Sequence, residues 1–321
     1  MILLWGLPQE RPIALVHEAL HRLGFPVIFL DQRQVLMTEV ELSVDSMIRG
    51  MLRTHDETID LNAITAVYLR PYDWRRLPEI EKARSRSSAW RHALEFEDVL
   101  ASWLEITPAL VVNRLTAMAA TNSKPDQASH IRACGFEVPE TLITTDPAAA
   151  QAFWDKYSTV IYKSISGVRS IVSHLTPEHA HRFADLVWCP TQFQQYIPGH
   201  DYRVHVVGHD VFACEITSEA DDYRYAAQQG AYVDIRASDL SQDMADHCRA
   251  LAATMNLLVA GIDLRCTPDG QWYCFEINPS PAFSSYQAAT NQPIDEAIAR
   301  LLGESSRLAL RLWPSLPTQP Y

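Results

Sequence analysis

Two stretches near the end of the chain decide its fold: Gly261-Ile262-Asp263-Leu264-Arg265 and Phe275-Glu276-Ile277-Asn278-Pro279-Ser280-Pro281. Both are rich in apolar residues, and Pro268-Asp269-Gly270 between them is a typical hairpin turn. The sequence therefore predicts two antiparallel strands joined by a tight turn. Because side chains alternate between the faces of a strand, one face should be packed by Ile262, Leu264, Phe275 and Ile277.

The other face of this hairpin carries three oxygen-bearing side chains. Glu276 and Asn278 are two positions apart, so their side chains leave the same face, and Asp263 on the partner strand can meet them. Two carboxylates and an amide oxygen form a hard-oxygen site, which suits magnesium held together with the phosphates of a nucleotide. On this pattern, solvated surface charges are an equal alternative.

The composition is that of a globular protein without an obvious polyanionic partner. The 321 residues suffice for roughly two or three domains, and 47% of them are hydrophobic. A formal net charge of −12 argues against a general binder of nucleic acids or anionic membranes. An anionic nucleotide would therefore need a local cationic pocket.

The sequence suggests a cytoplasmic protein. Residues 1–6 lack the basic start of a signal peptide, and no apolar run approaches the ~18–20 residues of a membrane span. The six cysteines are scattered without a Cys-x-x-Cys pair, which favours thiols buried in a reducing compartment over metal ligands or disulfides.

The first part of the chain predicts an open α/β domain. A helix at 11–23 follows a strand at 2–6, and a polar helix is expected at 79–104. Further strands are expected at 27–30, 64–69 and 109–113. The first turn has no Gly-x-Gly-x-x-Gly dinucleotide fingerprint. We place this front domain at residues 1–115.

After residue 116 the pattern mixes strands and helices and predicts an α+β fold. Helices are expected at 124–134, 177–187, 241–257 and 293–312, and strands at 159–163, 170–175, 191–197, 202–207 and 211–217. We divide this part into subdomains at 116–190 and 191–303, with a tail at 304–321.

Two lysines are candidate phosphate ligands. Lys163 ends an apolar strand and enters a loop of small residues at 164–170, where backbone N–H groups can hold phosphate oxygens. A lysine that simply reaches out to solvent is the alternative. Lys124 lies at a helix start, where a cation opposes the helix dipole and so indicates an anionic partner.

The segment 193–199 reads as a strand that leaves a domain, and such a strand can offer its backbone to an adenine edge. Arg203 and Arg224 each follow an Asp-Tyr pair, so each either pairs with its neighbouring Asp or faces a phosphate. No Cys/His quartet forms around the three histidines between 200 and 209, so a zinc site is not expected.

Taken in order, these motifs resemble the ATP-grasp superfamily over about residues 110–303. They are Asn-Ser-Lys124, Tyr-Lys163-Ser-Ile-Ser-Gly, Phe-Gln-Gln195-Tyr-Ile-Pro-Gly-His-Asp201-Tyr-Arg203, Gly-Ile-Asp263-Leu-Arg and Phe-Glu276-Ile-Asn278-Pro. The front part, with Asp60-Leu61-Asn62-Ala63-Ile64 and Tyr68-Leu69-Arg70, resembles the pre-ATP-grasp domain of graspetide (microviridin-type) peptide ligases. The motifs also resemble those of glutathione synthetases and of the glutamate-adding ligases.

The resemblance implies an ATP site between the two α+β subdomains. It assigns the phosphates to Lys124 and Lys163, and it makes Arg203 and Lys163 the catalytic pair, with Arg203 steadying the transferred phosphoryl group. It assigns nucleotide contacts, including the adenine hinge, to Gln195, Tyr196, Ile197 and Asp201. It assigns magnesium, with manganese as a substitute, to Asp263, Glu276 and Asn278.

The implied activity is an ATP-dependent carboxylate–amine ligase that forms an amide or ester through an acyl phosphate. Its substrates would be a peptide, amino acid or small metabolite, and a homodimer is expected by analogy. A phosphotransferase of the same fold and a nucleotide-binding module without turnover stay as alternatives. The loop after Lys163 departs from many relatives because Gly167 is its one glycine. An acceptor pocket and an ordinary polar loop are equal readings of Ser280, Ser284, Ser285 and Tyr286.

Overall fold

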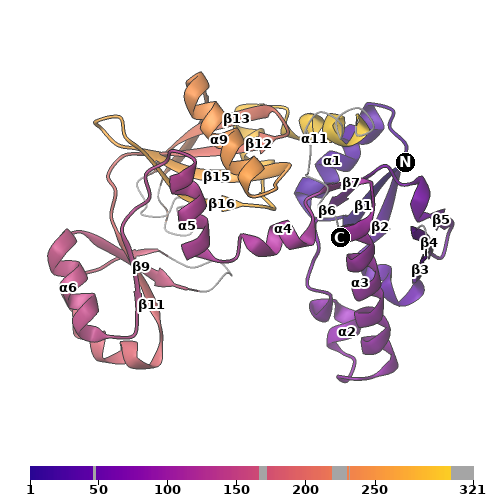
Figure 1. Cartoon of the computed structure of the whole chain (residues 1–321), viewed down its shortest axis with the longest axis horizontal. Coiled ribbons are helices and arrows are strands. Elements are labelled where there is room, and N and C mark those ends of the chain that lie inside the picture. The colour runs from indigo at the N-terminus through magenta and orange to yellow at the C-terminus, as the bar shows by residue number, and fades with distance from the viewer. Residues whose placement is uncertain (46–47, 166–171, 219–229, 231, 305–321) are drawn as a thin grey trace.

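The computed structural model describes residues 1–45, 48–165, 172–218, 230 and 232–304 (Figure 1). Within these ranges, none of the helices combines the length and the apolar character needed to cross a membrane. The predicted closing helix begins as expected, at Ile294, and α11 (Ile294–Gly303) is its described part. Residues 305–312 of that prediction lie outside the described residues.

The front domain is an open parallel sheet, as predicted. Its four strands have the order β2-β1-β6-β7 and are all parallel. They are β1 (Ile2–Gly6), β2 (Val27–Asp31), β6 (Ala66–Leu69) and β7 (Leu110–Val112). Helices α1 (Arg11–Arg22) and α11 pack on one face, and α3 (Ser88–Ile106) packs on the other. Every residue of β1 is therefore buried, as is usual for a strand covered on both faces.

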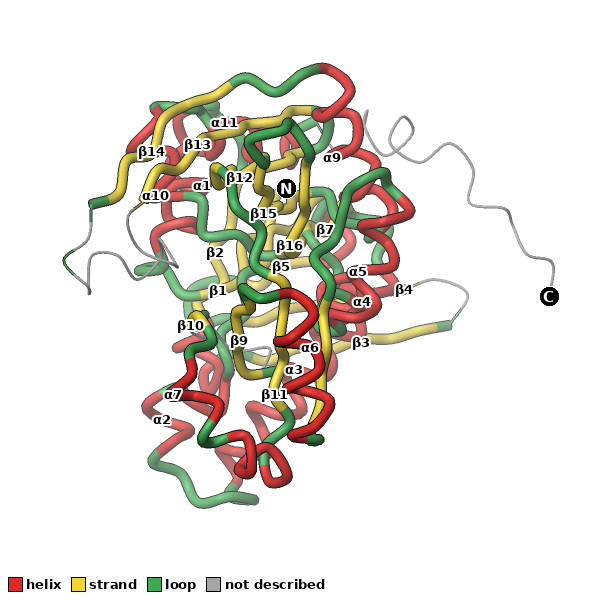
Figure 2. Tube along the Cα trace, turned by 90° about the vertical axis from the view of Figure 1, so that its left-hand side faces the viewer, coloured by secondary structure: helices red, strands yellow, loops and turns green. Residues whose placement is uncertain are grey.

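One prediction in the front domain is wrong, and one three-stranded sheet was missed. The single helix expected at 79–104 is two helices, α2 (Pro78–Glu81) and α3, because Ser87 caps a new helix by accepting the Trp90 N–H at 3.2 Å. Strands β3 (Glu39–Val44), β4 (Ile48–Arg53) and β5 (Thr58–Asp60) form an unpredicted antiparallel sheet. Figure 2 shows its β3–β4 arm projecting from the side of the molecule.

A second sheet, in the order β10-β9-β11-β8, is antiparallel throughout. Its strands are β8 (Thr141–Thr144), β9 (Val160–Ser164), β10 (Ser173–His174) and β11 (Thr191–Gln195). Helix α6 (Pro147–Tyr157) and the helical turns α7 (Pro177–Ala180) and η4 (Phe183–Trp188) pack on it. Because β11 belongs to this sheet, the boundary predicted at 190/191 cuts through it, and the two sheets part after β11 instead.

The third sheet has the order β14-β13-β12-β15-β16. Its strands are β12 (His200–Val207), β13 (Asp210–Ser218), β14 (Val233–Ser238), β15 (Val259–Cys266) and β16 (Trp272–Asn278). Helices α5 (Lys124–Ala133) and α9 (Gln242–Thr254) pack against one face, and α10 (Ser284–Thr290) covers part of the other. Although α5 was predicted with the central subdomain, it packs on this sheet, joined to β7 through α4 (Leu115–Ala120) (Figure 1).

Asn113, directly after β7, joins the front domain to the third sheet. Its Nδ2 donates to the carbonyl oxygens of Val259 and Pro279, each at 2.6 Å. Its Oδ1 accepts from the N–H groups of Leu258 at 2.8 Å and Val259 at 3.2 Å. The carboxyl edge of the front sheet is thereby bonded to the start of β15 and to the residue that follows β16.

Candidate functional site

The hairpin predicted from the opening stretches is confirmed, with Asp263 directly opposite Glu276 and Gly261 opposite Asn278. The pairing then shifts by one, so that Leu264 lies opposite Cys274 and Phe275 is an extra residue on β16. Such a β-bulge re-aims the side chains next to it. The prediction that Phe275 packs in the core is therefore wrong: it lines a pocket instead.

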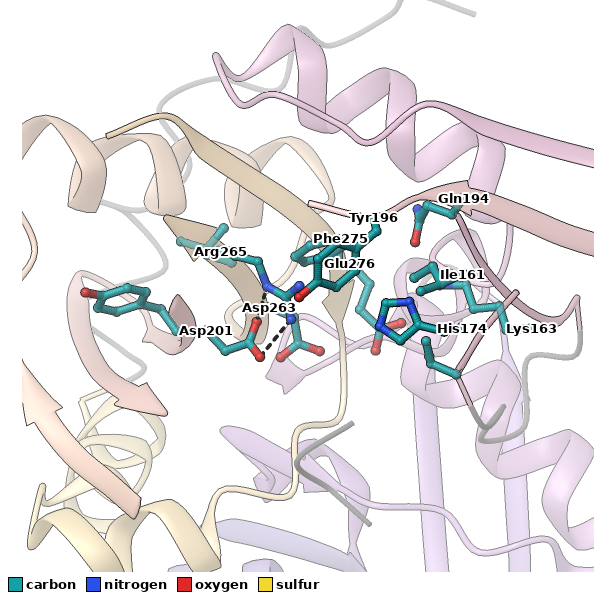
Figure 3. Close-up of a pocket in the computed structure, with 13 residues that line it drawn as sticks. Ile161, Lys163, His174, Gln194, Tyr196, Asp201, Asp263, Arg265, Phe275 and Glu276 are labelled. Atoms are coloured by element: carbon teal, nitrogen blue, oxygen red, sulfur yellow. Dashed lines mark hydrogen bonds and ion pairs between the residues drawn. The ribbon is translucent and has the colours of Figure 1, made fainter. Parts of the chain in front are cut away.

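This pocket lies between the second and third sheets (Figure 3). Apolar and aromatic side chains form its walls, and charged side chains from both sheets converge on it. The residues that line it are Ile161, Lys163, Val172, His174, Gln194, Tyr196, Asp201, Tyr202, Asp263, Leu264, Arg265, Phe275 and Glu276. An apolar cleft with a few placed polar groups is the usual form of a small-molecule site.

The structure brings half of the predicted site residues together in this pocket. They are Lys163, Tyr196, Asp201, Asp263 and Glu276. The other five do not line it: Lys124, Gln195, Ile197, Arg203 and Asn278. Of the loop after Lys163, residues 166–170 lie outside the described residues, as does Arg224.

The segment predicted as the adenine hinge already uses several of its backbone groups. The Gln195 N–H donates to the carbonyl of Glu140 at 2.9 Å, and the Tyr196 N–H donates to that of Thr159 at 3.1 Å. The Ile197 carbonyl accepts from Nη1 of Arg265 at 2.7 Å. The Tyr196 ring lies against His174, with ring centroids 4.8 Å apart, and so closes one wall of the pocket.

Arg265 is a pocket residue that sequence reasoning missed. Its guanidinium grips Asp201 with two bonds, Nε to Oδ1 at 2.7 Å and Nη2 to Oδ2 at 2.9 Å (Figure 3). It also lies 5.7 Å from the Tyr196 ring centroid and 5.3 Å from that of Phe275, distances at which cation–π attraction is favourable. The available signal was its position two residues after Asp263, which places both side chains on one face.

Arg203 lies beside the pocket and forms an ion pair with Asp263, Nη1 to Oδ1 at 2.6 Å. It is 5% exposed, and the Tyr286 ring centroid lies 5.7 Å from its guanidinium carbon. Of the two alternatives for Arg203, pairing with its sequence neighbour Asp201 is wrong, because Arg203 pairs with Asp263 and Arg265 holds the Asp201 carboxylate.

The face behind Arg203 is packed. The His205 ring lies 5.2 Å from that of Tyr286, and burial, followed by the nearby charge of Arg203, lowers the pKa of His205 well below its usual range. Tyr286 is buried on α10, so the polar-loop alternative for that residue is wrong.

The oxygen donors at the end of the hairpin fit magnesium. Asp263 and Glu276 are directly opposed, and Asn278 Oδ1 accepts the N–H of Ser280 at 2.8 Å. No group of three or more His, Cys, Asp or Glu side chains placed to hold a metal occurs in the described part of the chain. The predicted donors are two carboxylates and an amide, a set that would suit an ion that draws its remaining ligands from phosphates and water.

The comparisons with known proteins place the chain in one family. A model described as "RimK-like ATP-grasp domain" matches residues 123–302. No curated protein matches the chain.

Among solved structures, the chain is similar to a Chryseobacterium gregarium RiPP-associated ATP-grasp ligase in complex with ADP and a leader and core peptide. The identity is 23% over 94% of this chain and 96% of that one, with a TM-score of 0.81. Macrocyclase MdnC of Microcystis aeruginosa MRC, bound with precursor peptide MdnA, is 22% identical over 94% and 99%, with a TM-score of 0.80. PsnB, complexed with minimal precursor, Mg and ADP, is 26% identical over 95% and 97%, with a TM-score of 0.77.

The predicted ATP-grasp fold is therefore confirmed. Since the family model covers more than half of the sequence, the chain belongs to the RimK-like ATP-grasp family, as an ATP-dependent ligase.

Proposed function

We propose that this ligase activates a carboxylate of a peptide substrate as an acyl phosphate and joins it to an amine or hydroxyl. One observation carries the proposal: Asp263 faces Glu276 across the hairpin, at a pocket whose other wall brings Lys163 from the second sheet. Carboxylates for a metal opposite a lysine for phosphate are the groups that phosphoryl transfer requires.

In this proposal the nucleotide base lies against the apolar walls from Ile161, Tyr196 and Phe275. Arg265, which also holds Asp201 of β12 with two bonds, donates from Nη1 to the Ile197 carbonyl and so ties the hinge segment to the third sheet. The phosphates point toward Lys163, with Lys124 at the start of α5 as a second cation. Asp263, Glu276 and Asn278 would hold magnesium, or manganese in its place, which when bound neutralises phosphate charge.

The reaction then needs little covalent chemistry from the protein. A substrate carboxylate oxygen attacks the γ-phosphorus of ATP, the bond to the β-phosphate oxygen breaks, and ADP leaves. An amine or hydroxyl then attacks the acyl carbon, and inorganic phosphate leaves with the former carboxylate oxygen. Arg203, held over the backbone of Gly261, would steady the negative charge on the phosphoryl group in transfer.

The peptide nature of the substrate is part of the proposal. The similar structures from Chryseobacterium gregarium and Microcystis aeruginosa hold leader, core or precursor peptides. Those peptides are substrates or partners of those proteins alone. The likeness of this chain to two ligases that both hold a peptide supports a peptide substrate here. A cytoplasmic location and a homodimer complete the proposal.

ADP release from ATP and magnesium, screened against pooled peptides, amino acids and carboxylic acids with mass spectrometry of each pool, tests it. A product one water lighter than two inputs combined is expected. A product that gains a phosphate would instead indicate a phosphotransferase, and nucleotide binding without turnover in any pool would indicate a binding module. The Glu276→Ala variant should stay folded by circular dichroism and lose turnover.

A further inference from the structure

The side chain of Gln127 joins helix α5 to the β15–β16 hairpin, which carries the proposed metal ligands. Its Oε1 accepts from the Ile277 N–H at 3.1 Å, and its Nε2 donates to the Ile277 carbonyl at 3.1 Å. The same Nε2 also donates to the carbonyl of Thr121. The side chain is 6% exposed, and all its donors and its acceptor are used.

This contact is made with an edge strand, beside an irregularity in its pairing. Ile277 lies between Glu276 and Asn278, on β16, which is the edge strand of the third sheet. The bulge at Phe275 interrupts the β15–β16 pairing directly before Glu276. Pairing with β15 resumes at Glu276, Ile277 and Asn278, but on an edge strand the backbone groups that point away from β15 have no neighbouring strand to bond.

The outer edge of β16 is bonded on both sides of the bulge. Before it, the Glu137 N–H donates to the Trp272 carbonyl at 3.1 Å, and the Cys274 N–H donates to the Glu137 carbonyl at 2.9 Å. After it, the Gln127 amide pairs with both backbone groups of Ile277, as a neighbouring strand residue would. The glutamine side chain thus satisfies the outward backbone groups of Ile277, between the two proposed metal ligands Glu276 and Asn278.

We propose that Gln127 is a positioning residue for Glu276 and Asn278. This inference rests on the proposed function. Gln127 lies one helical turn after Lys124, at the start of α5, so it joins the helix that begins at this lysine to the strand that carries Glu276 and Asn278. Groups that orient metal ligands typically change metal affinity tenfold to a hundredfold when they are removed.

The chain offers a matched control. Gln32, 2% exposed in the front domain, clasps Tyr72 in the same way: Oε1 accepts the Tyr72 N–H at 2.8 Å, and Nε2 donates to its carbonyl at 3.2 Å. A merely structural role predicts the same effect for Gln127→Met and Gln32→Met. A positioning role predicts that they differ in metal affinity.

The experiment measures Mn²⁺ binding to the full chain in the presence of AMPPNP, by the paramagnetic resonance signal of free Mn²⁺. For Gln127→Met we expect the Mn²⁺ dissociation constant to rise about tenfold to a hundredfold. For Gln32→Met we expect the wild-type constant, although both variants lose thermal stability. AMPPNP affinity without metal should change by less than about threefold in either variant.

A second variant, Gln127→Glu, keeps the acceptor toward the Ile277 N–H and loses both donors, and it carries the test if Gln127→Met does not fold. Wild-type Mn²⁺ affinity in a folded Gln127 variant would overturn the inference, as would an equal loss in Gln32→Met. A wild-type protein that binds AMPPNP but takes up no Mn²⁺ would overturn the proposed metal site and this inference with it. Turnover screens are separate from all of these readouts.

Discussion

At the scale of single residues, Gly261 makes room for the guanidinium of Arg203. A Cβ at this position would overlap Nη2 of Arg203 and come 2.7 Å from Cβ of Pro281. Real Cβ atoms do not approach so closely, so any side chain here forces Arg203 away from Asp263. The glycine is therefore needed for space, since it lies in a regular strand opposite Asn278.

We expect Gly261→Ala to lower turnover at least tenfold, which corresponds to about 1.4 kcal/mol of lost transition-state stabilisation. The reason is the displacement of Arg203 from its position beside Asp263. ADP release checks turnover, and equilibrium binding of AMPPNP checks that the base pocket is intact. Full turnover in the folded variant would refute a role for this close approach.

Glu97, on α3, gives the front domain a pH-dependent stability. Burial, opposed by the Gln32 bond and aided by the charges of Asp98 and Asp73, raises the pKa of Glu97 from 4.5 to about 7. The unfolded chain therefore loses this proton first. The contribution of the protonated Glu97 carboxyl to the unfolding free energy is fully present below pH 4.5. This contribution, about 3 kcal/mol, is lost as the pH rises through 7.

Glu97→Gln should remove this pH dependence, because an amide does not titrate. Its amide oxygen can still accept from Nε2 of Gln32, so the contact itself is kept. Urea unfolding at pH 5, 6, 7 and 8 measures it, with wild type and variant compared at each pH. The variant should gain stability most at pH 8. Parallel pH profiles for the two proteins would contradict the assignment.

At the scale of elements, the sequence predicted the β15–β16 hairpin and its facing carboxylates because both follow from local patterning. The bulge at Phe275 could not be predicted. Cys274 and Ile277 are both buried although three positions apart, and the sequence alone does not show which residue between them is the extra one. The β3–β5 sheet was missed for a related reason. Its strands mix apolar with exposed charged and polar residues, so they lack the apolar runs that indicate a strand.

The Arg265 contact joins β15 to the segment between the second and third sheets. We expect Arg265→Lys to weaken nucleotide binding roughly tenfold, because a lysine cannot bond both Asp201 oxygens and the Ile197 carbonyl together. Titration with AMPPNP measures the loss. The exposed Arg236→Lys on β14 is the matched control and should bind as wild type does.

At the scale of the whole molecule, the open front sheet and the mixed part after it could be predicted, because their strand and helix patterns differ. The packing of α5 on the third sheet could not. Its hydrophobic contacts, through Ile131, are made with strands more than 70 residues later in the chain. Similarly, no local pattern shows that Asn113 bonds the start of β15 and the residue after β16.

Asn113→Ala should cost about 2–4 kcal/mol of unfolding free energy, because four backbone groups lose a buried partner. Urea denaturation measures this value. The exposed Asn62→Ala should change it by less than about 0.5 kcal/mol. A small effect at Asn113 would mean that the front domain is held to the hairpin by other contacts.

The ion pair between Arg203 and Asp263, 2.6 Å long, has a consequence for the order in which ligands gather. The pair joins a cation that suits phosphate to an anion that suits magnesium. A metal bound at Asp263, as proposed above, would weaken the hold of this carboxylate on the guanidinium, and a phosphate bound at Arg203 would weaken the hold of the guanidinium on the carboxylate. Each ligand thus prepares the place of the other, and by thermodynamic reciprocity the gain in affinity is equal in both directions. We therefore expect heterotropic cooperativity between nucleotide and metal, if both bind as proposed.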